Sequence, residues 1–181
     1  MSHQPLVTPS VVLVTGIMGA GKSTVAQALA EQLPKAAHVR GDLFRRMIVA
    51  GGAPMLPNAG DEARSQLRLR YRMGASVADA FAAGGFTAVY QDIILGDDLR
   101  EVVASVRTRP LFVIVLVPRP EIALRRADAR HKESGYGEWT AEALHELLLG
   151  TPRIGLWLDT SDQTAEQSVS AILARLDEAR I

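Results

Sequence analysis

The stretch Gly16-Ile-Met-Gly-Ala-Gly-Lys-Ser23 decides the fold, because it has the form G-x-x-x-x-G-K-[ST] that makes a phosphate-binding loop. An apolar run, Val11–Thr15, comes directly before it, and a helical pattern, Lys22–Leu33, begins inside it. A strand that ends in a glycine-rich turn and continues as a helix is the context in which this motif works. The sequence therefore predicts a nucleotide-binding loop at the first strand of a sheet.

Each residue type in this loop has a physical task. Glycines at positions 16, 19 and 21 carry no Cβ atom, so the backbone can turn and approach a phosphate group. Lys22 would bring its charge to the β- and γ-phosphate oxygens, and the Ser23 hydroxyl would bind Mg²⁺. ATP and Mg²⁺ are therefore the expected cofactors. The backbone N–H groups expected to point at the β-phosphate belong to Gly19, Ala20, Gly21, Lys22, Ser23 and Thr24.

Around this loop, short apolar runs alternate with helix-length amphipathic stretches, which is typical of a parallel sheet covered on both faces. The predicted strands are Val11–Thr15, Ala36–Arg40, Phe86–Gln91, Leu111–Val117 and Ile154–Leu158. The predicted helices are Lys22–Leu33, Asp42–Ala50, Asp61–Ala83, Asp97–Arg107, Pro120–Arg130, Thr140–Leu149 and Thr164–Ala179. The predicted fold class is therefore α/β, with a five-stranded parallel sheet.

The composition limits the partners that the chain can have. At 181 residues it has the size of one domain, which we expect to span residues 1–181. The 20 basic and 20 acidic residues balance, which disfavours nucleic acid as a partner but leaves it open. The absence of cysteine excludes disulfides, a thiolate metal site and a cysteine nucleophile. With no apolar run of membrane-spanning length, we expect no membrane partner, a cytoplasmic location and a monomer or dimer.

Missing motifs narrow the class of nucleotide-binding protein. A GTPase would carry D-x-x-G and N-K-x-D segments, and an ABC ATPase would need a longer chain and an S-G-G-Q-like segment. None of these is present. The remaining class is a small-molecule kinase, with its phosphate loop near the N-terminus and an arginine-rich helix late in the chain.

Four segments, and above all their order along the chain, carry a resemblance to a known family. They are the phosphate loop, Val39–Arg45, Tyr90–Gly96, and Arg126–Arg130 together with Leu158–Ser161. Over nearly its whole length the chain resembles the P-loop kinases grouped with chloramphenicol phosphotransferase, gluconate and shikimate kinases, and polynucleotide 5′-kinase. The resemblance implies a nucleoside-monophosphate-kinase-like P-loop NTPase with strand order 2-3-1-4-5 and helices on both faces. It also implies that Thr160 lies in the loop beside the adenine.

Asp42 is the candidate general base. It follows a predicted strand at the edge where open α/β sheets bind ligands, and the resemblance places the matching aspartate against the acceptor hydroxyl. A carboxylate there can accept the hydroxyl proton as the new bond to phosphorus forms. Arg45, three residues later, is expected to help bind the acceptor. The alternative is that Asp42 caps the following helix, and the two roles are compatible.

Asp92 also ends a predicted strand, in the segment Tyr90-Gln-Asp92-Ile-Ile-Leu-Gly96. This segment is similar to D-D-x-x-L in the related kinases, although Gln91 stands where they have the first aspartate. We expect Asp92 to contact the acceptor side of the site and to hold Mg²⁺, directly or through water. The alternative is an ordinary loop aspartate.

Arg126 and Arg130 are four residues apart, so they share one face of a helix. The polar, glycine-containing segment His131–Glu138 follows them, and we expect a lid over about residues 125–139. Both arginines would then neutralise charge on the transferring phosphoryl group and bind the nucleotide. The alternative is a solvated helix face.

The predicted helix Asp61–Ala83 carries two stripes of residues. The stripe expected to pack on the core consists of Leu67, Tyr71, Gly74, Ala78 and Phe81. The other stripe either faces the cleft, which would favour an anionic acceptor, or is solvated, and it consists of Arg64, Arg68 and Arg72. The preceding loop, Gly51–Gly60, either contacts the substrate or is a surface excursion.

Together these features predict an ATP-dependent phosphotransferase that moves the γ-phosphoryl group to a hydroxyl of a metabolite or antibiotic. One alternative is a polynucleotide 5′-hydroxyl kinase, although the chain has zero net charge and lacks an aromatic-lined basic groove. The other is a nucleotide-dependent switch that hydrolyses ATP slowly.

Overall fold

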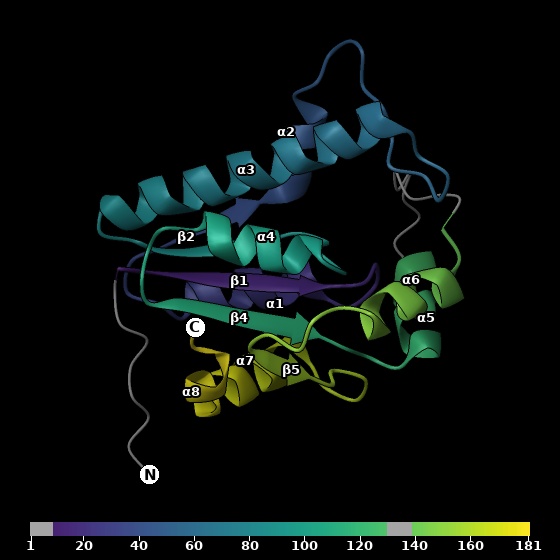
Figure 1. The fold of residues 1–181 in the computed structure, drawn as a ribbon. Helices are drawn as coiled ribbons and strands as arrows, with labels where there is room; N and C mark the ends of the chain where they lie inside the picture. The colour runs from purple at the N-terminus through teal and green to yellow at the C-terminus, as the bar shows by residue number, and fades with distance from the viewer. Residues whose placement is uncertain (1–8, 130–138) are drawn as a thin grey trace.

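The computed structural model describes residues 9–129 and 139–181, and a parallel sheet forms its centre (Figure 1). The strand order is β2-β3-β1-β4-β5, and every neighbouring pair is parallel. The predicted fold class and strand order are therefore confirmed. The strands are β1 Ser10–Gly16, β2 Ala36–Arg40, β3 Thr87–Gln91, β4 Leu111–Leu116 and β5 Leu156–Leu158.

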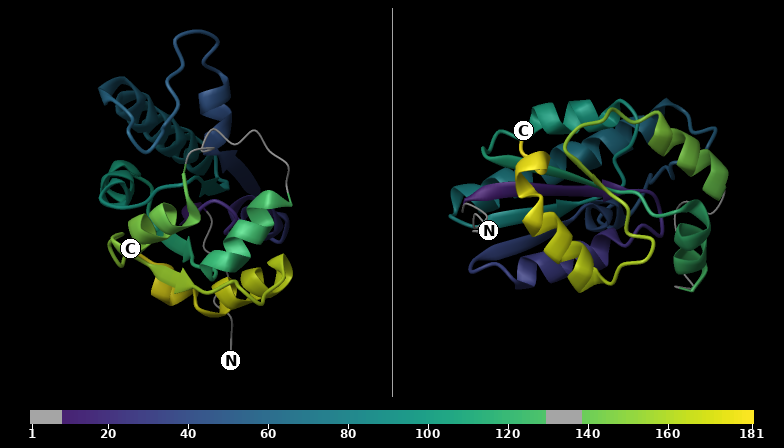
Figure 2. Two further views of the ribbon diagram at one scale, coloured as in Figure 1. Left: turned by 90° about the vertical axis from the view of Figure 1, so that its right-hand side faces the viewer. Right: turned by 90° about the horizontal axis from the view of Figure 1, so that it is seen from below.

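Helices cover both faces of this sheet (Figure 2). On one face, α1 (Lys22–Glu31) packs against β2, β3 and α7 (Ala165–Ala174). On the other, α3 (Asp61–Ala83) packs against β1, β2, β3 and α4 (Asp98–Ser105). All residues of β1 and β4 are buried between these layers, which explains their nearly continuous apolar sequences. The remaining helices are α2 Gly41–Arg46, α5 Pro120–Asp128, α6 Ala141–Leu149 and α8 Leu176–Ala179.

Two helices differ from the prediction by more than two residues at one end. Helix α2 ends at Arg46 rather than at Ala50, so the connection to α3 spans residues 47–60. The predicted helix Thr164–Ala179 breaks at Arg175 into α7 and α8. The break turns the end of the chain back onto the sheet, where α8 packs on β4 and β5 and the Ile181 N–H donates to Leu111 O at 2.9 Å.

The parallel strands bring all predicted site segments to one edge of the sheet. β1 lies between β3 and β4. Helix α1, which follows β1, packs on one face of the sheet, and α4, which follows β3, packs beside α3 on the other. Ligands of open α/β sheets bind at such a point, beyond the carboxyl ends of the strands. Within the described residues, no helix is both long and apolar enough to span a membrane.

Candidate functional site

The phosphate loop has the strained geometry that only glycine tolerates. Gly16, Gly19 and Gly21 have φ angles of 143°, 77° and 92°, which L side chains rarely adopt. A Cβ atom on Gly19 would also lie 1.9 Å from the carbonyl oxygen of Ala123 in α5. The predicted glycine positions are therefore required by backbone conformation, and at Gly19 also by packing.

Helix α1 begins at the phosphate loop, and no acidic side chain in its first turn offsets the positive end of the helix dipole. Gly21 is the N-cap of this helix. Anions are stabilised at such a position by the helix dipole and the first N–H groups. Lys22 is nearly buried there, and its Nζ donates a hydrogen bond to Ile17 O at 2.8 Å.

Ser23 and Gln91 meet at the predicted metal position. Ser23 Oγ donates to Gln91 Oε1 at 3.3 Å, so the glutamine that replaces the expected aspartate lies beside the predicted ligand. Both side chains offer uncharged oxygen atoms, which suit a hard cation such as Mg²⁺. No group of three His, Cys, Asp or Glu residues in the described ranges could hold a metal ion alone. These residues fit a Mg²⁺ ion that shares its ligands with nucleotide phosphates, and Ser23 as ligand stays a prediction.

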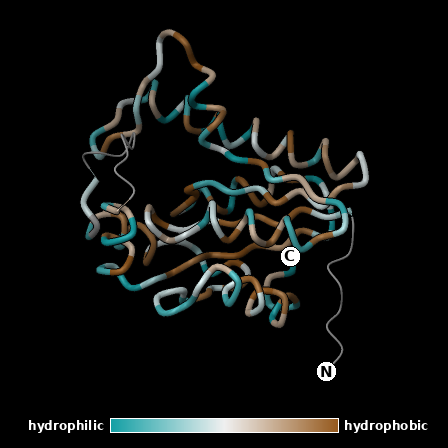
Figure 3. Tube along the Cα trace, turned by 180° about the vertical axis from the view of Figure 1, so that it is seen from behind, coloured by the Kyte–Doolittle hydropathy of each residue, from teal (hydrophilic) through white to brown (hydrophobic). Residues whose placement is uncertain are grey.

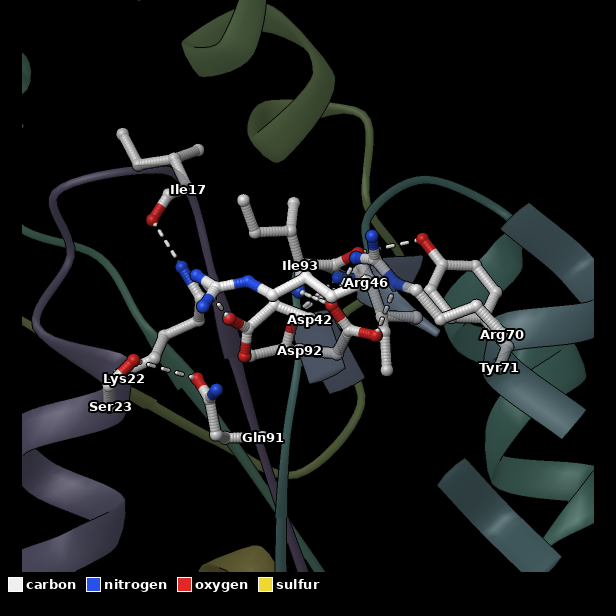
Figure 4. A network of polar contacts seen from close by, with 12 residues as sticks. Ile17, Lys22, Ser23, Asp42, Arg46, Arg70, Tyr71, Gln91, Asp92 and Ile93 are labelled. Atoms are coloured by element: carbon white, nitrogen blue, oxygen red, sulfur yellow. Dashed lines mark hydrogen bonds and ion pairs between the residues drawn. The ribbon is translucent and has the colours of Figure 1, made fainter. Parts of the chain in front are cut away.

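Asp92 lies in a buried ion pair that the sequence did not reveal (Figure 4). Arg70 of α3 donates from Nε to Asp92 Oδ2 at 2.8 Å and from Nη2 to Oδ1, and the N–H of Ile93 donates to Oδ1. Burial raises the pKa of Asp92, while the charges of Arg70 and Lys22 oppose that rise. Both carboxylate oxygens are thus engaged by protein donors, and a metal role for Asp92 stays a prediction.

Asp42 lies inside the first turn of α2, because the helix begins one residue earlier, at Gly41. The N-cap of α2 is Arg40, so the alternative that Asp42 caps this helix is wrong. Asp42 forms an ion pair with Arg46 across a distance of 3.2 Å. A Cβ atom on Gly41 would lie 2.0 Å from Asp92 Oδ2, so the two aspartates are brought together where β2 and β3 end.

A cavity of about 330 Å³ opens on the other side of the phosphate loop. Its volume lies in the range of small-ligand sites. Thr160 lines it and donates from Oγ1 to Ala20 O at 3.4 Å, which ties the loop after β5 to the phosphate loop. The other lining residues are Ala20, Gly21, Thr24, Val25, Arg126, Ala129, Gln163, Thr164, Ala165 and Ser168.

Arg126 belongs to this cavity rather than to a solvated helix face. Its Nη2 donates to the carbonyl oxygens of Thr160 at 2.9 Å and Ser161 at 3.3 Å. The guanidinium thus links α5 to the loop after β5. Arg130 and most of the predicted lid, residues 130–138, lie outside the described residues.

The long helix α3 decides one open alternative and corrects one prediction. The stripe of Arg64, Arg68 and Arg72 is exposed, and Arg68 lies 4.0 Å from Glu101 of α4, so the solvated alternative holds. Phe81 was expected in the core, but 40% of it is exposed. Arg70 was missed, although it lies three residues after Leu67 and four before Gly74, within the core stripe. An arginine inside an apolar stripe is itself a signal of a buried partner.

A family model for an AAA domain (AAA_33) matches residues 11–153. A search of curated protein sequences finds no match. Among solved structures, a sugar kinase from Janibacter sp. HTCC2649 is 24% identical, with 96% of each chain covered and a TM-score of 0.66. The tunicamycin resistance protein of Deinococcus radiodurans is 14% identical over 94% of this chain and 97% of its own, with a TM-score of 0.68. A gluconokinase from Sinorhizobium meliloti 1021 is 21% identical over 93% of both, with a TM-score of 0.60. These likenesses show the fold.

Proposed function

Because the chain belongs to the AAA_33 family of P-loop domains, we propose that it is a kinase that transfers the γ-phosphoryl group of ATP to a hydroxyl of a small molecule. The observation that carries this proposal is the arrangement around the phosphate loop. A ligand-sized cavity lies on one side of the loop, and Asp42 and Asp92 lie on the other. This arrangement offers separate places for a nucleotide and an acceptor.

The nucleotide would lie in the cavity beside Thr160 and Arg126, with its phosphates on the N–H groups that begin α1. Lys22 would stabilise the charge that develops on the γ-phosphoryl oxygens. Ser23, with Gln91 beside it, would hold Mg²⁺, which when bound offsets negative charge on the β- and γ-phosphates. Arg126 is positioned to bind the nucleotide.

The acceptor would approach from the side of Asp42. Its hydroxyl oxygen forms the new bond to the γ-phosphorus, and the bond to the β–γ bridging oxygen breaks, so that ADP leaves with the electron pair. Asp42 accepts the hydroxyl proton. Arg46, which pairs with Asp42 at 3.2 Å, would orient this carboxylate before the acceptor binds.

Mass spectrometry of reaction products tests this function. The protein is incubated with ATP, Mg²⁺ and pooled metabolites, antibiotics and 5′-hydroxyl oligonucleotides. We expect one compound to gain a single phosphoryl group, and Lys22→Ala to abolish the gain because the γ-phosphoryl charge is no longer opposed. Release of inorganic phosphate with no phosphorylated acceptor would instead indicate a nucleotide-dependent switch. Phosphorylation of the oligonucleotide alone would indicate a polynucleotide kinase.

A further inference from the structure

A second cavity lies on the acceptor side, between α2, the segment 47–60 and α3. Eight of its eleven lining residues are apolar. These are Phe44, Ile48, Ala53, Met55, Ala63, Leu67, Leu69 and Met73, and the three polar ones are Arg45, Gln66 and Arg70. Nothing in the proposed transfer reaction uses this apolar lining.

Two of the three polar lining residues are neighbours of the proposed reacting groups. Arg45 lies in α2, three residues after Asp42, and Arg70 is the partner of Asp92. An acceptor that places its hydroxyl at Asp42 can therefore extend past these two arginines into the apolar part. The cavity is the continuation of the acceptor side of the site.

Hydrogen bonds from side chains to its backbone hold the segment that covers this cavity. Gln66 accepts the N–H of Ala53 at 2.8 Å and donates to Gly51 O at 2.8 Å. Trp139, which precedes α6, donates from Nε1 to Met55 O at 2.9 Å. With its polar backbone groups satisfied in this way, the segment turns the side chains of Ala53 and Met55 to the cavity.

The side chains of the apolar lining can also rearrange. As it stands the cavity holds about 30 Å³, the space of roughly one water molecule, so an acceptor must displace side chains to enter. Met55 and Met73 are flexible enough to repack around a guest. Leu69, in the lining, is 41% exposed, so the cavity reaches the surface. In Figure 3 the top of the segment that rises between α2 and α3 is brown, and much of the rest is paler.

We propose, resting on the phosphotransferase function above, that the acceptor is an alcohol with an apolar body, which seats in this cavity while its hydroxyl faces Asp42. A polyol would need several hydrogen-bond partners around its body. The lining offers only three polar side chains, and two of them are already engaged, Gln66 with the covering segment and Arg70 with Asp92. An alkyl or aromatic body requires no such partners.

Rates of phosphoryl transfer to a graded set of alcohols test this inference. The set contains 1,2-alkanediols of four, six and eight carbons, a hexitol and a 5′-hydroxyl oligonucleotide, each with ATP and Mg²⁺. Each buried methylene is worth a factor of roughly four in affinity, so kcat/KM should rise by about tenfold or more for every two carbons added. The hexitol should be a poorer acceptor than the six-carbon diol.

Two neighbouring substitutions provide matched variants. Ile48→Asn places an amide in the cavity and should flatten the dependence on chain length. Val49→Asn makes the same chemical change one residue later, where the side chain is 99% exposed, and should preserve that dependence. Calorimetric titration should give unchanged ATP affinity in both variants, because neither residue lines the nucleotide cavity. Light scattering should show the same mass for both.

The outcomes separate this inference from the function on which it rests. Transfer that is equal for all diols, or that favours the hexitol or the oligonucleotide, overturns the apolar acceptor and leaves the kinase intact. A flat dependence together with a changed mass in Ile48→Asn alone overturns it in favour of contact between copies of the chain. Tight ATP binding with no transfer to any alcohol of this set overturns the apolar acceptor, and the absence of transfer to the pooled metabolites and antibiotics as well overturns the kinase function.

Discussion

The Arg70–Asp92 pair fixes a buried carboxylate within electrostatic reach of Lys22. A lone charge at this depth would be costly, and the bidentate guanidinium compensates for the lost hydration. Arg70 also lines the apolar cavity, so one side chain joins the acceptor cavity to the end of β3.

A double-mutant cycle tests this pair. Arg70→Met and Asp92→Asn should each lower the free energy of unfolding by about 3 to 5 kcal/mol, because each leaves a buried group without its partner. The double variant should lose less than the sum of both. Urea unfolding measures all three. The exposed pair Arg175–Glu178, at 2.7 Å, is the control and should contribute about 0 to 1 kcal/mol. Additive losses at 70 and 92 would contradict the pairing.

The roles of some single residues could be predicted from the sequence, and those of others could not. The role of the phosphate-loop glycines could be predicted because the φ angles of all three, and the close contacts at Gly16 and Gly19, permit little else. Arg70 could not, because its partner is 22 residues away and only the fold brings them together. Asp42 was placed correctly at a strand end, but its helix begins one residue earlier than predicted.

At the scale of elements, Asp79 ties the last third of α3 to the turn that leads into β4. Its carboxylate, which is nearly buried, accepts the N–H groups of Arg107 at 3.1 Å and Thr108 at 2.9 Å, and the Thr108 hydroxyl at 2.7 Å. Burial alone would raise the pKa of Asp79, but the hydrogen bonds from Thr108 and Arg107 outweigh it and lower the pKa.

This anchor predicts a pH-dependent loss of stability. A lowered folded-state pKa means that the ionised form stabilises the fold above the unfolded value of about 3.9, and that this contribution disappears as the pH falls through the folded pKa. Asp79→Asn should therefore cost about 1 to 3 kcal/mol near neutral pH. The difference from the unchanged chain should shrink below about pH 4.

Urea unfolding from pH 7 to pH 2 measures the effect of Asp79→Asn. Asp61→Asn, at an exposed position in the first turn of the same helix, is the control and should cost at most about 1 kcal/mol, through its lost interaction with the helix dipole. A constant difference between Asp79→Asn and the unchanged chain over this whole range would show that ionisation of Asp79 does not stabilise the fold.

Elements with a strong periodic pattern were predicted well, and their ends less so. The bounds of α3 agree with the prediction, since its stripe of buried residues is long. Helix α2 ends four residues earlier than predicted, because Met47 is its C-cap and the chain then continues into a segment rich in glycine and proline. That segment is held over the apolar cavity by the hydrogen bond from Trp139 to Met55. The two residues are 84 positions apart in the chain, so no local sequence pattern can predict this contact.

For the whole molecule, the alternation of apolar runs and amphipathic helices was enough to predict the α/β class, and the resemblance supplied the strand order. The sheet then places the phosphate loop, Asp42, Asp92 and Thr160 along one edge, where each follows a different strand. The acceptor is not encoded in any motif, because the apolar cavity is assembled from α2, α3 and the segment between them.

The central claim is that ATP bound at the phosphate loop reacts with a hydroxyl held by Asp42, and the ATP affinity and turnover of Asp42→Asn test it most directly. With the acceptor found by mass spectrometry, turnover should fall by about a hundredfold or more, as expected for removal of a general base. Calorimetric ATP affinity in the presence of Mg²⁺ should stay within about twofold of the unchanged chain. Lys22→Ala should lose both. Full turnover in Asp42→Asn, or loss of its ATP binding, would contradict the account.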